Sequence, residues 1–243
     1  LTNSPKKNRF DHEEIKEVMD LCLSCKGCKT ECPSSVDVAK MKAEFLQHYY
    51  DEHGAGFRTK LIANFTDSQK LGSLVASLPT VNGTTLSQWV RKQKIVPRAK
   101  RRVYLFSDEF TEYNDAEIGI TAYKLLTTLG YEVVIPKHVQ SGRTFLSKGF
   151  VKEAKKIANQ NISFLKDLIT DDTPLLGIEP SGIITFRDEY LSLVDENLRS
   201  DALRVAKNAL MIDEFLLAEI EAGRILREQF TAGDRKIKLH GHC

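Results

Sequence analysis

The sequence contains no apolar run approaching the roughly 20 residues that a bilayer-crossing helix needs. Its net charge is only +2, which is too small to indicate a nucleic-acid partner. Cysteine is scarce, with five among 243 residues. Four of the five fall within eleven residues. A content of 42% hydrophobic and 28% charged residues is typical of a globular protein with room for two domains. We expect the protein to lie in the reducing cytoplasm. If it associates with the inner membrane, we expect that association to be peripheral.

The four clustered cysteines follow the spacing Cys22-x2-Cys25-x2-Cys28-x3-Cys32, and Pro33 comes next. This is the bacterial ferredoxin run, in which a short loop wraps a cubic cluster and the fourth cysteine ligates a second cluster. The spacing predicts that Cys22, Cys25 and Cys28 bind one 4Fe-4S cluster and that Cys32 binds another. The remaining ligands would then come from a segment or subunit outside this sequence.

Two other uses of the same cysteines can be weighed against this prediction. A disulfide framework suits small secreted domains, and four cysteines crowded into eleven residues make poor disulfide geometry. A zinc site usually uses paired Cys-x2-Cys motifs separated by a longer loop, whereas this run is continuous. A zinc-binding module and a metal-free structural or docking module stay open as alternatives. Metal analysis distinguishes them, because the outcomes are iron with sulfide, zinc, or no metal.

Residues 1–92 have a helical pattern. Asp11 can cap a first helix that leads into the cysteine loop, with Glu14 in a capping-box-like position. Ser35 or Asp37 can cap a second helix, and Gly54 lies just beyond its end. Shorter helices are predicted over 61–65, 71–78 and 86–90.

Residues 102–235 alternate between strand and helix patterns, after a basic stretch at 93–101 that we interpret as a linker. Buried strands are predicted at 103–106, 131–135 and 175–178, and helices at 118–129, 146–157 and 212–220. This order predicts an α/β lobe with a mostly parallel sheet covered on both faces, and an α + α/β fold for the whole chain. Such folds place their chemistry at the carboxyl ends of the strands.

With these motifs the chain resembles the iron–sulfur C-terminal region of flavin-linked 2-hydroxyacid dehydrogenases, the group that includes D-lactate and D-2-hydroxyglutarate dehydrogenase-like enzymes. The resemblance rests on residues 22–40, 178–190 and 239–243. It implies a helical two-cluster ferredoxin half-domain over 1–92 and a partial, heterodisulfide-reductase-like cysteine-rich domain over 102–235.

The resemblance also implies a role. The parent protein would be an FAD-linked oxidoreductase acting on CH–OH groups, with the flavin domain and the missing ferredoxin half upstream. This chain would then relay electrons from reduced flavin to a downstream acceptor. It would not bind FAD itself, and none of its residues would be catalytic.

The chain departs from that family at several places. Gln140-Ser141-Gly142 stands where the family often has Cys-Cys-Gly, and Pro180-Ser181-Gly182 stands where many relatives carry cysteine. We therefore expect the α/β lobe to hold no thiolate-bound metal and to be a degenerate copy kept for packing, docking or a polar substrate contact. Residues 236–243 resemble the start of a truncated second lobe, in which His240, His242 and Cys243 have donors suited to metal. We expect the chain to be part of a longer polypeptide.

Two further groups of polar residues have competing interpretations. His138 and Arg143 flank the loop after the second predicted strand, where they could face the flavin or its acid substrate, or be solvated. Arg187, Asp188 and Glu189 follow a predicted helix start at Ser181. We interpret these three as structural, with Arg187 pairing locally.

Overall fold

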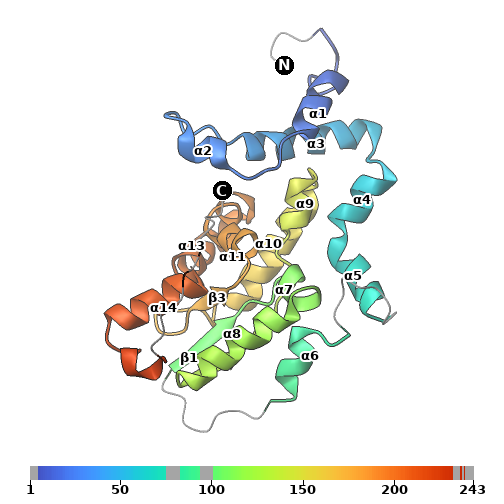
Figure 1. Cartoon of the computed structure of the whole chain (residues 1–243). Helices are drawn as coiled ribbons and strands as arrows, with labels where there is room; N and C mark the ends of the chain where they lie inside the picture. Colours follow the sequence, from blue (N-terminus) through green and yellow to red (C-terminus); the bar gives the residue numbers. More distant parts are fainter. Residues whose placement is uncertain (1–4, 75–82, 94–100, 232–235, 237, 239–243) are drawn as a thin grey trace. The chain divides into compact units, whose positions relative to one another are not determined.

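The computed structural model describes residues 5–74, 83–93, 101–231, 236 and 238 (Figure 1). The chain forms two compact units. Among the described residues, the first contains 5–65 and 142–155 and the second contains 66–141 and 156–231. Within the described ranges no helix combines the length and the apolar character required to span a membrane.

The first unit is entirely helical in its described part. It comprises α1 (Glu13–Asp20), α2 (Gly27–Glu31), α3 (Val38–His53), α4 (Phe57–Ala63), α9 (Arg143–Ser147) and the first residues of α10 (Val151–Leu165). Asp37 caps α3, as predicted, because its Oδ1 accepts a hydrogen bond from the Lys40 amide at 2.9 Å. Gly54 ends α3 with φ of 71°, also as predicted.

The predicted cap of α1 is wrong by one residue. His12 occupies the N-cap, and its side chain makes no capping hydrogen bond. Asp11 instead lies 2.8 Å from His53 Nε2, and Glu14 lies 2.6 Å from His12 Nδ1. The Asp11 carboxylate, which the local pattern assigned to the cap, therefore pairs with His53 of α3, more than forty residues away along the chain.

The core of the first unit is built on α3. Phe45 and Leu46 are buried on its inner face. The Tyr50 ring stacks on Phe150 at 5.6 Å between centroids. Gly149 has φ of 80°, and a Cβ there would lie 2.3 Å from the Leu46 Cβ, so only glycine fits. In contrast, α1 and α2 bury none of their side chains.

The second unit is the α/β lobe, and its sheet confirms the predicted fold class. All four strands are parallel, in the order β2-β1-β3-β4. The strands are β1 (Arg101–Leu105), β2 (Tyr131–Val134), β3 (Leu175–Gly177) and β4 (Ala209–Met211). The helices are α5 (Phe65–Leu74), α6 (Leu86–Arg91), α7 (Glu109–Tyr113), α8 (Ala116–Thr128), the rest of α10, α11 (Pro180–Arg187), α12 (Tyr190–Leu193), α13 (Arg199–Lys207) and α14 (Ile212–Glu221).

Successive residues of β1 point to opposite faces of the sheet. Val103 and Leu105 belong to one buried cluster, which also contains side chains of α6, α8 and α14. Tyr104, together with Phe106 just after the strand, belongs to a second cluster built with α10, α11, α12 and α13. Both faces of the parallel sheet are therefore covered by helices, as the strand–helix alternation predicts.

The fourth strand was not predicted. Ala209, Leu210 and Met211 pair in parallel with β3, between α13 and α14. Three residues without a β-branched side chain carry no alternation that could be recognised in the sequence. Two of the three predicted short helices differ in their limits as well, since α4 and α5 cover 57–63 and 65–74 in place of 61–65 and 71–78. Part of the 71–78 segment lies outside the described residues, and α6 agrees with the predicted 86–90 within one residue.

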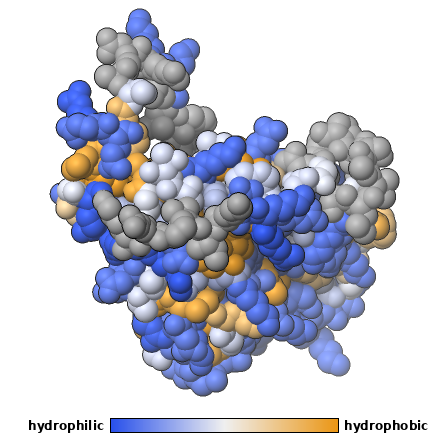
Figure 2. All heavy atoms as spheres, turned by 90° about the horizontal axis from the view of Figure 1, so that it is seen from below, coloured by the Kyte–Doolittle hydropathy of each residue, from blue (hydrophilic) through white to orange (hydrophobic). Residues whose placement is uncertain are grey.

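Hydrophobic residues also reach the surface. On the face seen in Figure 2 they lie in scattered patches among hydrophilic residues. Several of the most exposed are in the first unit, and they include Leu21, Leu23 and Phe57.

Candidate iron–sulfur site

The four clustered cysteines lie on one short turn–helix–turn segment of the first unit. Cys22 follows α1, Cys25 precedes α2, Cys28 is inside α2 and Cys32 is the C-cap of α2. All four are free thiols; Cys25 is exposed and the other three are partly buried. The segment therefore presents four sulfur donors within a single helical turn and its two flanks.

The backbone around these cysteines adopts an unusual conformation. Ser24, Lys26 and Ser35 have φ of 58°, 64° and 51°. They are the three residues other than glycine with positive φ in the described part of the chain. Left-handed backbone at such residues costs about 1 kcal/mol or more each and collects at functional sites. None of the three is glycine or asparagine, so the sequence carried no signal of this conformation.

Backbone amides of the segment are directed at the cysteine sulfurs. The Ser24 amide lies 3.4 Å from Cys22 Sγ, and the Val38 amide lies 3.4 Å from Cys28 Sγ. Amide hydrogen bonds from Val36 and Ser34 lower the pKa of the Cys32 thiol below its ordinary value. Hydrogen bonds to sulfur favour the thiolate, which is the form that binds metal.

Two basic side chains donate hydrogen bonds to main-chain carbonyls of the cysteine segment. Lys42 is buried, and its Nζ donates to the Cys22 carbonyl at 2.6 Å. Burial lowers the pKa of Lys42, with smaller opposing and supporting contributions from nearby charges. Arg143, at the start of α9, donates to the Ser24 carbonyl. From the sequence, Arg143 was expected to face the flavin or its acid substrate, or to be solvated. In the structure it contacts the cysteine segment.

Lys42 was not identified from the sequence, although a signal was present. It lies three residues after Ala39 and four before Leu46, and all three are buried on the same face of α3. A lysine inside an apolar stripe indicates a buried partner, because burying an ammonium group without hydrogen bonds is costly.

Two lysines that flank Cys28 share one carboxylate. Lys26 and Lys29 lie 3.8 and 3.9 Å from Asp37 Oδ2, so the cap of α3 also anchors α2. Four basic side chains, those of Lys26, Lys29, Lys42 and Arg143, therefore lie in the cysteine segment or contact its neighbours. Cations at this place suit an anionic thiolate-bound group.

The donor set can be tested against the kinds of metal that cysteine binds. In the described ranges, no group of three or more His, Cys, Asp or Glu side chains is placed to hold a single metal ion. A tetrahedral zinc site needs three or four ligands that converge on one point. The Cys-x2-Cys-x2-Cys-x3-Cys spacing, with amides directed at the sulfurs of Cys22, Cys28 and Cys32, is that of the bacterial ferredoxin run, in which the irons are bound at separate corners of a cluster.

The loop Gln140-Ser141-Gly142 is held by hydrogen bonds. The Ser141 amide and hydroxyl donate to Glu109 at 2.9 and 2.7 Å. The Tyr190 hydroxyl donates to the Ser141 carbonyl at 2.9 Å. Glu109 and Ser141 are buried. Sequence reasoning missed Glu109, because no local pattern links it to a serine 32 residues away.

The remaining candidate residues have different outcomes. Cys243, His240 and His242 lie outside the described residues. Arg187 does not pair locally; it donates to Glu214 of α14 at 2.7 and 2.9 Å. His138 is a partly buried residue whose ring packs on Phe106 at 4.7 Å, so it is not a freely solvated loop residue.

Comparison with known proteins identifies two kinds of relative, dehydrogenases and iron–sulfur proteins. The chain is 26% identical over 96% of its length to D-2-hydroxyglutarate dehydrogenase of Escherichia coli, and it covers 25% of that protein. It is 23% identical to a probable glycolate oxidase iron–sulfur subunit of Bacillus subtilis, over 76% of this chain and 50% of the relative. An uncharacterized iron–sulfur protein of Methanococcus maripaludis is 26% identical over 70% of the chain and 34% of its own length.

These similarities confirm the resemblance inferred from the motifs. The chain spans about a quarter of the length of the D-2-hydroxyglutarate dehydrogenases that it matches. No protein-family model matches the sequence, and no solved structure matches it.

Proposed function

We propose that this chain is the iron–sulfur electron-transfer region of a flavin-linked 2-hydroxyacid dehydrogenase. The observation that carries the proposal is the four-cysteine segment, in which backbone amides are directed at the sulfurs of Cys22, Cys28 and Cys32. Such hydrogen bonds favour thiolates and raise the potential of a bound cluster. Similarity to dehydrogenases and to iron–sulfur proteins over most of the chain supports the same role.

Each cysteine has an assigned place in the proposal. Cys22, Cys25 and Cys28 would hold one 4Fe-4S cluster and Cys32 a second, while the other ligands come from a second cysteine run. Clusters of this kind accept and release single electrons. Lys42 and Arg143, which hold the carbonyls of Cys22 and Ser24, would offset the negative charge of the thiolates.

The oxidation itself would occur elsewhere in the parent protein. There a flavin would take two electrons from a hydroxy acid, and this region would pass them on singly to a downstream acceptor. The chain contributes no catalytic residue and does not bind FAD. We place the protein in the cytoplasm, where thiols stay reduced.

The test uses the natural gene product, purified without oxygen. We expect iron and acid-labile sulfide in equal amounts, visible absorption that bleaches on reduction, and EPR signals of reduced clusters. A colourless protein without sulfide and without an EPR signal would overturn the proposal. Zinc without sulfide would favour the zinc-binding module, and no metal would favour the structural or docking module.

Cysteine variants test the sharing between two clusters. Cys28→Ser should abolish one EPR signal and Cys32→Ser the other, each with a loss of about half of the iron, because the two thiolates serve different clusters. Ser34→Ala is the matched control: its side chain is exposed, and its amide remains available to Cys32. Loss of the same signal in both cysteine variants would contradict the sharing.

A further inference from the structure

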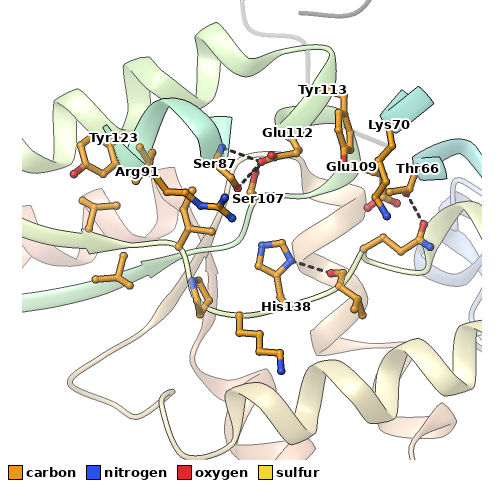
Figure 3. Close-up of a pocket in the computed structure, with 18 of the residues that line it drawn as sticks. Thr66, Lys70, Ser87, Arg91, Ser107, Glu109, Glu112, Tyr113, Tyr123 and His138 are labelled. Carbon is orange, nitrogen blue, oxygen red and sulfur yellow. Dashed lines mark hydrogen bonds between the residues drawn. The ribbon is translucent and has the colours of Figure 1, made fainter. Parts of the chain in front are cut away.

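The α/β unit contains a cavity of about 770 Å³ beside the edge strand β2 (Figure 3). Its walls come from α5, α6, α7, α8, α10, β2 and the segments that follow β1 and β2. Ser107 and His138, which follow the carboxyl ends of β1 and β2, both line it. Small-molecule sites usually measure about 300 to 1,000 Å³ and lie at this end of parallel sheets. None of the four clustered cysteines lines the cavity.

One carboxylate of the cavity wall is already occupied by protein donors. Glu112 Oε2 accepts hydrogen bonds from the Ser87 amide at 3.1 Å, the Ser87 hydroxyl at 2.8 Å and the Ser107 hydroxyl at 2.6 Å. Glu109 is likewise bound by Ser141. Glu109 and Glu112 are therefore part of the structure of the wall. The hydroxyl protons of the serines that bind them are already donated and are not available to a ligand.

His138 presents an acceptor to the cavity. Its Nδ1 lies 2.9 Å from the Val139 carbonyl, so this nitrogen carries the proton. Burial lowers the pKa of His138, which keeps the ring neutral at physiological pH. The other nitrogen, Nε2, is then an acceptor, and it has no hydrogen-bond partner among the described residues. Figure 3 shows this nitrogen directed into the cavity, on the side of Ser107 and Arg91.

Arg91 presents a donor to the same space. Figure 3 shows its guanidinium extending from α6 toward Ser107. It forms no ion pair or hydrogen bond with any residue that the structure describes. A guanidinium binds a carboxylate or phosphate through two parallel hydrogen bonds. Val90, Val133 and Ile135 supply an apolar wall between the polar groups.

We propose that this cavity binds a small organic anion that carries a hydroxyl group. The anionic group would bind the Arg91 guanidinium, the hydroxyl would donate to His138 Nε2, and the carbon chain would lie against Val90 and Val133. The site is separate from the cysteine segment, so the proposal does not depend on the iron–sulfur function. It concerns binding and involves no oxidation of the ligand.

Calorimetric titration of the chain with malate and succinate tests the proposal, because the two dianions differ by a single hydroxyl. We expect saturable binding of malate at one site per chain and binding of succinate about tenfold weaker, the value of one hydrogen bond. Inorganic phosphate serves as a third probe. Phosphate binding as tight as malate binding would overturn the assignment to a hydroxylated organic anion.

Variants assign the two contacts. Arg91→Gln should weaken both dianions about tenfold or more, because it removes the cation and its paired donors. Arg102→Gln is the matched control, since Arg102 is an exposed arginine that pairs with Glu132 at 3.0 Å and does not line the cavity. His138→Phe keeps a ring on Phe106 and should lower malate affinity to that of succinate, with succinate unchanged.

Two results would contradict the proposal. One is the absence of saturable malate binding up to 10 mM, about the weakest affinity that a specific site of this size would show. The other is malate binding that Arg91→Gln leaves unchanged; this variant stays informative even if His138→Phe fails to fold, because Arg91 is exposed. Cluster content does not enter either result, so failure here is distinguishable from failure of the iron–sulfur proposal.

Discussion

The α/β unit and the cysteine segment of the other unit are stabilised in different ways. The α/β unit buries apolar side chains on both faces of its sheet, including Leu105, Leu176 and Phe186 at 0% exposure. The cysteine segment leaves apolar side chains in solvent, with Leu21 80% and Leu23 89% exposed, whereas α3 of the same unit buries Phe45 and Leu46. A fully buried leucine or phenylalanine contributes about 1.5 to 3 kcal/mol. The segment that bears the cysteines does not receive this contribution.

The same segment also contains the residues in left-handed conformation, which cost further free energy. Its described order comes from hydrogen bonds to main-chain carbonyls and to sulfur, as at Lys42 and Cys28. Under the proposed function, cluster binding would supply the missing stabilisation, because metal binding and local folding are coupled. The α/β unit is therefore stabilised by its apolar core, whereas the cysteine segment is stabilised by polar contacts and, under the proposed function, by a bound cluster.

The largest effect is expected at Glu219 of the α/β unit. This buried carboxylate accepts from Arg101 at 2.9 Å, from Arg224 at 2.7 Å and from the Tyr131 hydroxyl at 2.6 Å. Burial raises its pKa, but the hydrogen bonds from Arg224 and Tyr131 and the charges of Arg101 and Arg224 together outweigh this, and the net pKa is lowered. Glu219→Ala leaves these donors without their acceptor and should reduce the free energy of unfolding by about 3 to 5 kcal/mol.

Trp89, the single tryptophan, reports this unfolding in urea, because it lies in the α/β unit at 5.6 Å from the Tyr123 ring. Glu221→Ala, at an exposed position of the same helix, should change stability by less than about 0.5 kcal/mol. Equal losses in the two variants would show that Glu219 is not an internal anchor.

The next effect concerns Asp108, which caps α7 through the amides of Phe110 and Thr111 at 2.9 and 3.0 Å. Burial raises its pKa from 3.8 to about 6. Between these pH values the folded chain holds a proton that the unfolded chain has released, so stability falls as pH rises from about 4 to about 6. The contribution is at most about 3 kcal/mol.

Asp108→Asn retains an oxygen acceptor for the cap and removes the titration. We expect its urea midpoint, followed by Trp89 fluorescence, to depend less on pH between 4 and 6 than that of the unchanged chain. An identical pH dependence in the two proteins would mean that Asp108 titrates near its ordinary value in the folded state.

Sequence reasoning recovered features that depend on neighbouring residues. The strands β1, β2 and β3 were located within two residues because each is a short apolar run. Ser35 or Asp37 was predicted at the start of α3 and Gly54 at its end, and the structure selects Asp37, because caps have local residue preferences. Covering of both sheet faces followed from the alternation of strands and helices.

Features that depend on distant partners were missed. Asp11 pairs with His53 and leaves the cap of α1, and Arg187 reaches Glu214 in another helix. For the candidate site, spacing indicated the four cysteines, but the contact of Arg143 with the cysteine segment required the tertiary structure. The placement of the cavity groups Arg91 and His138 required it as well.

A smaller effect is expected at the cap of α3 in the cysteine-bearing unit. Asp37→Ala removes the bond to the Lys40 amide and the shared partner of Lys26 and Lys29. We expect a loss of about 1 kcal/mol, seen as faster hydrogen exchange of the Lys40 amide, whereas Trp89 should report no change. Glu44→Ala, exposed on the same helix, is the control. Exchange at Lys40 that matches this control would rule out a capping role for Asp37.

The smallest effect is expected at Leu23, between two of the cysteines. Leu23→Ser should change the free energy of unfolding of the cysteine-bearing unit by less than about 0.5 kcal/mol, because an exposed side chain loses no packing. Leu46→Ala, in the core of the same unit at 1% exposure, should cost about 2 to 5 kcal/mol. Far-ultraviolet circular dichroism during urea unfolding measures both. A loss above 2 kcal/mol for Leu23→Ser would mean that this leucine is packed in the folded protein, and the contrast between the two units would then not extend to the cysteine segment.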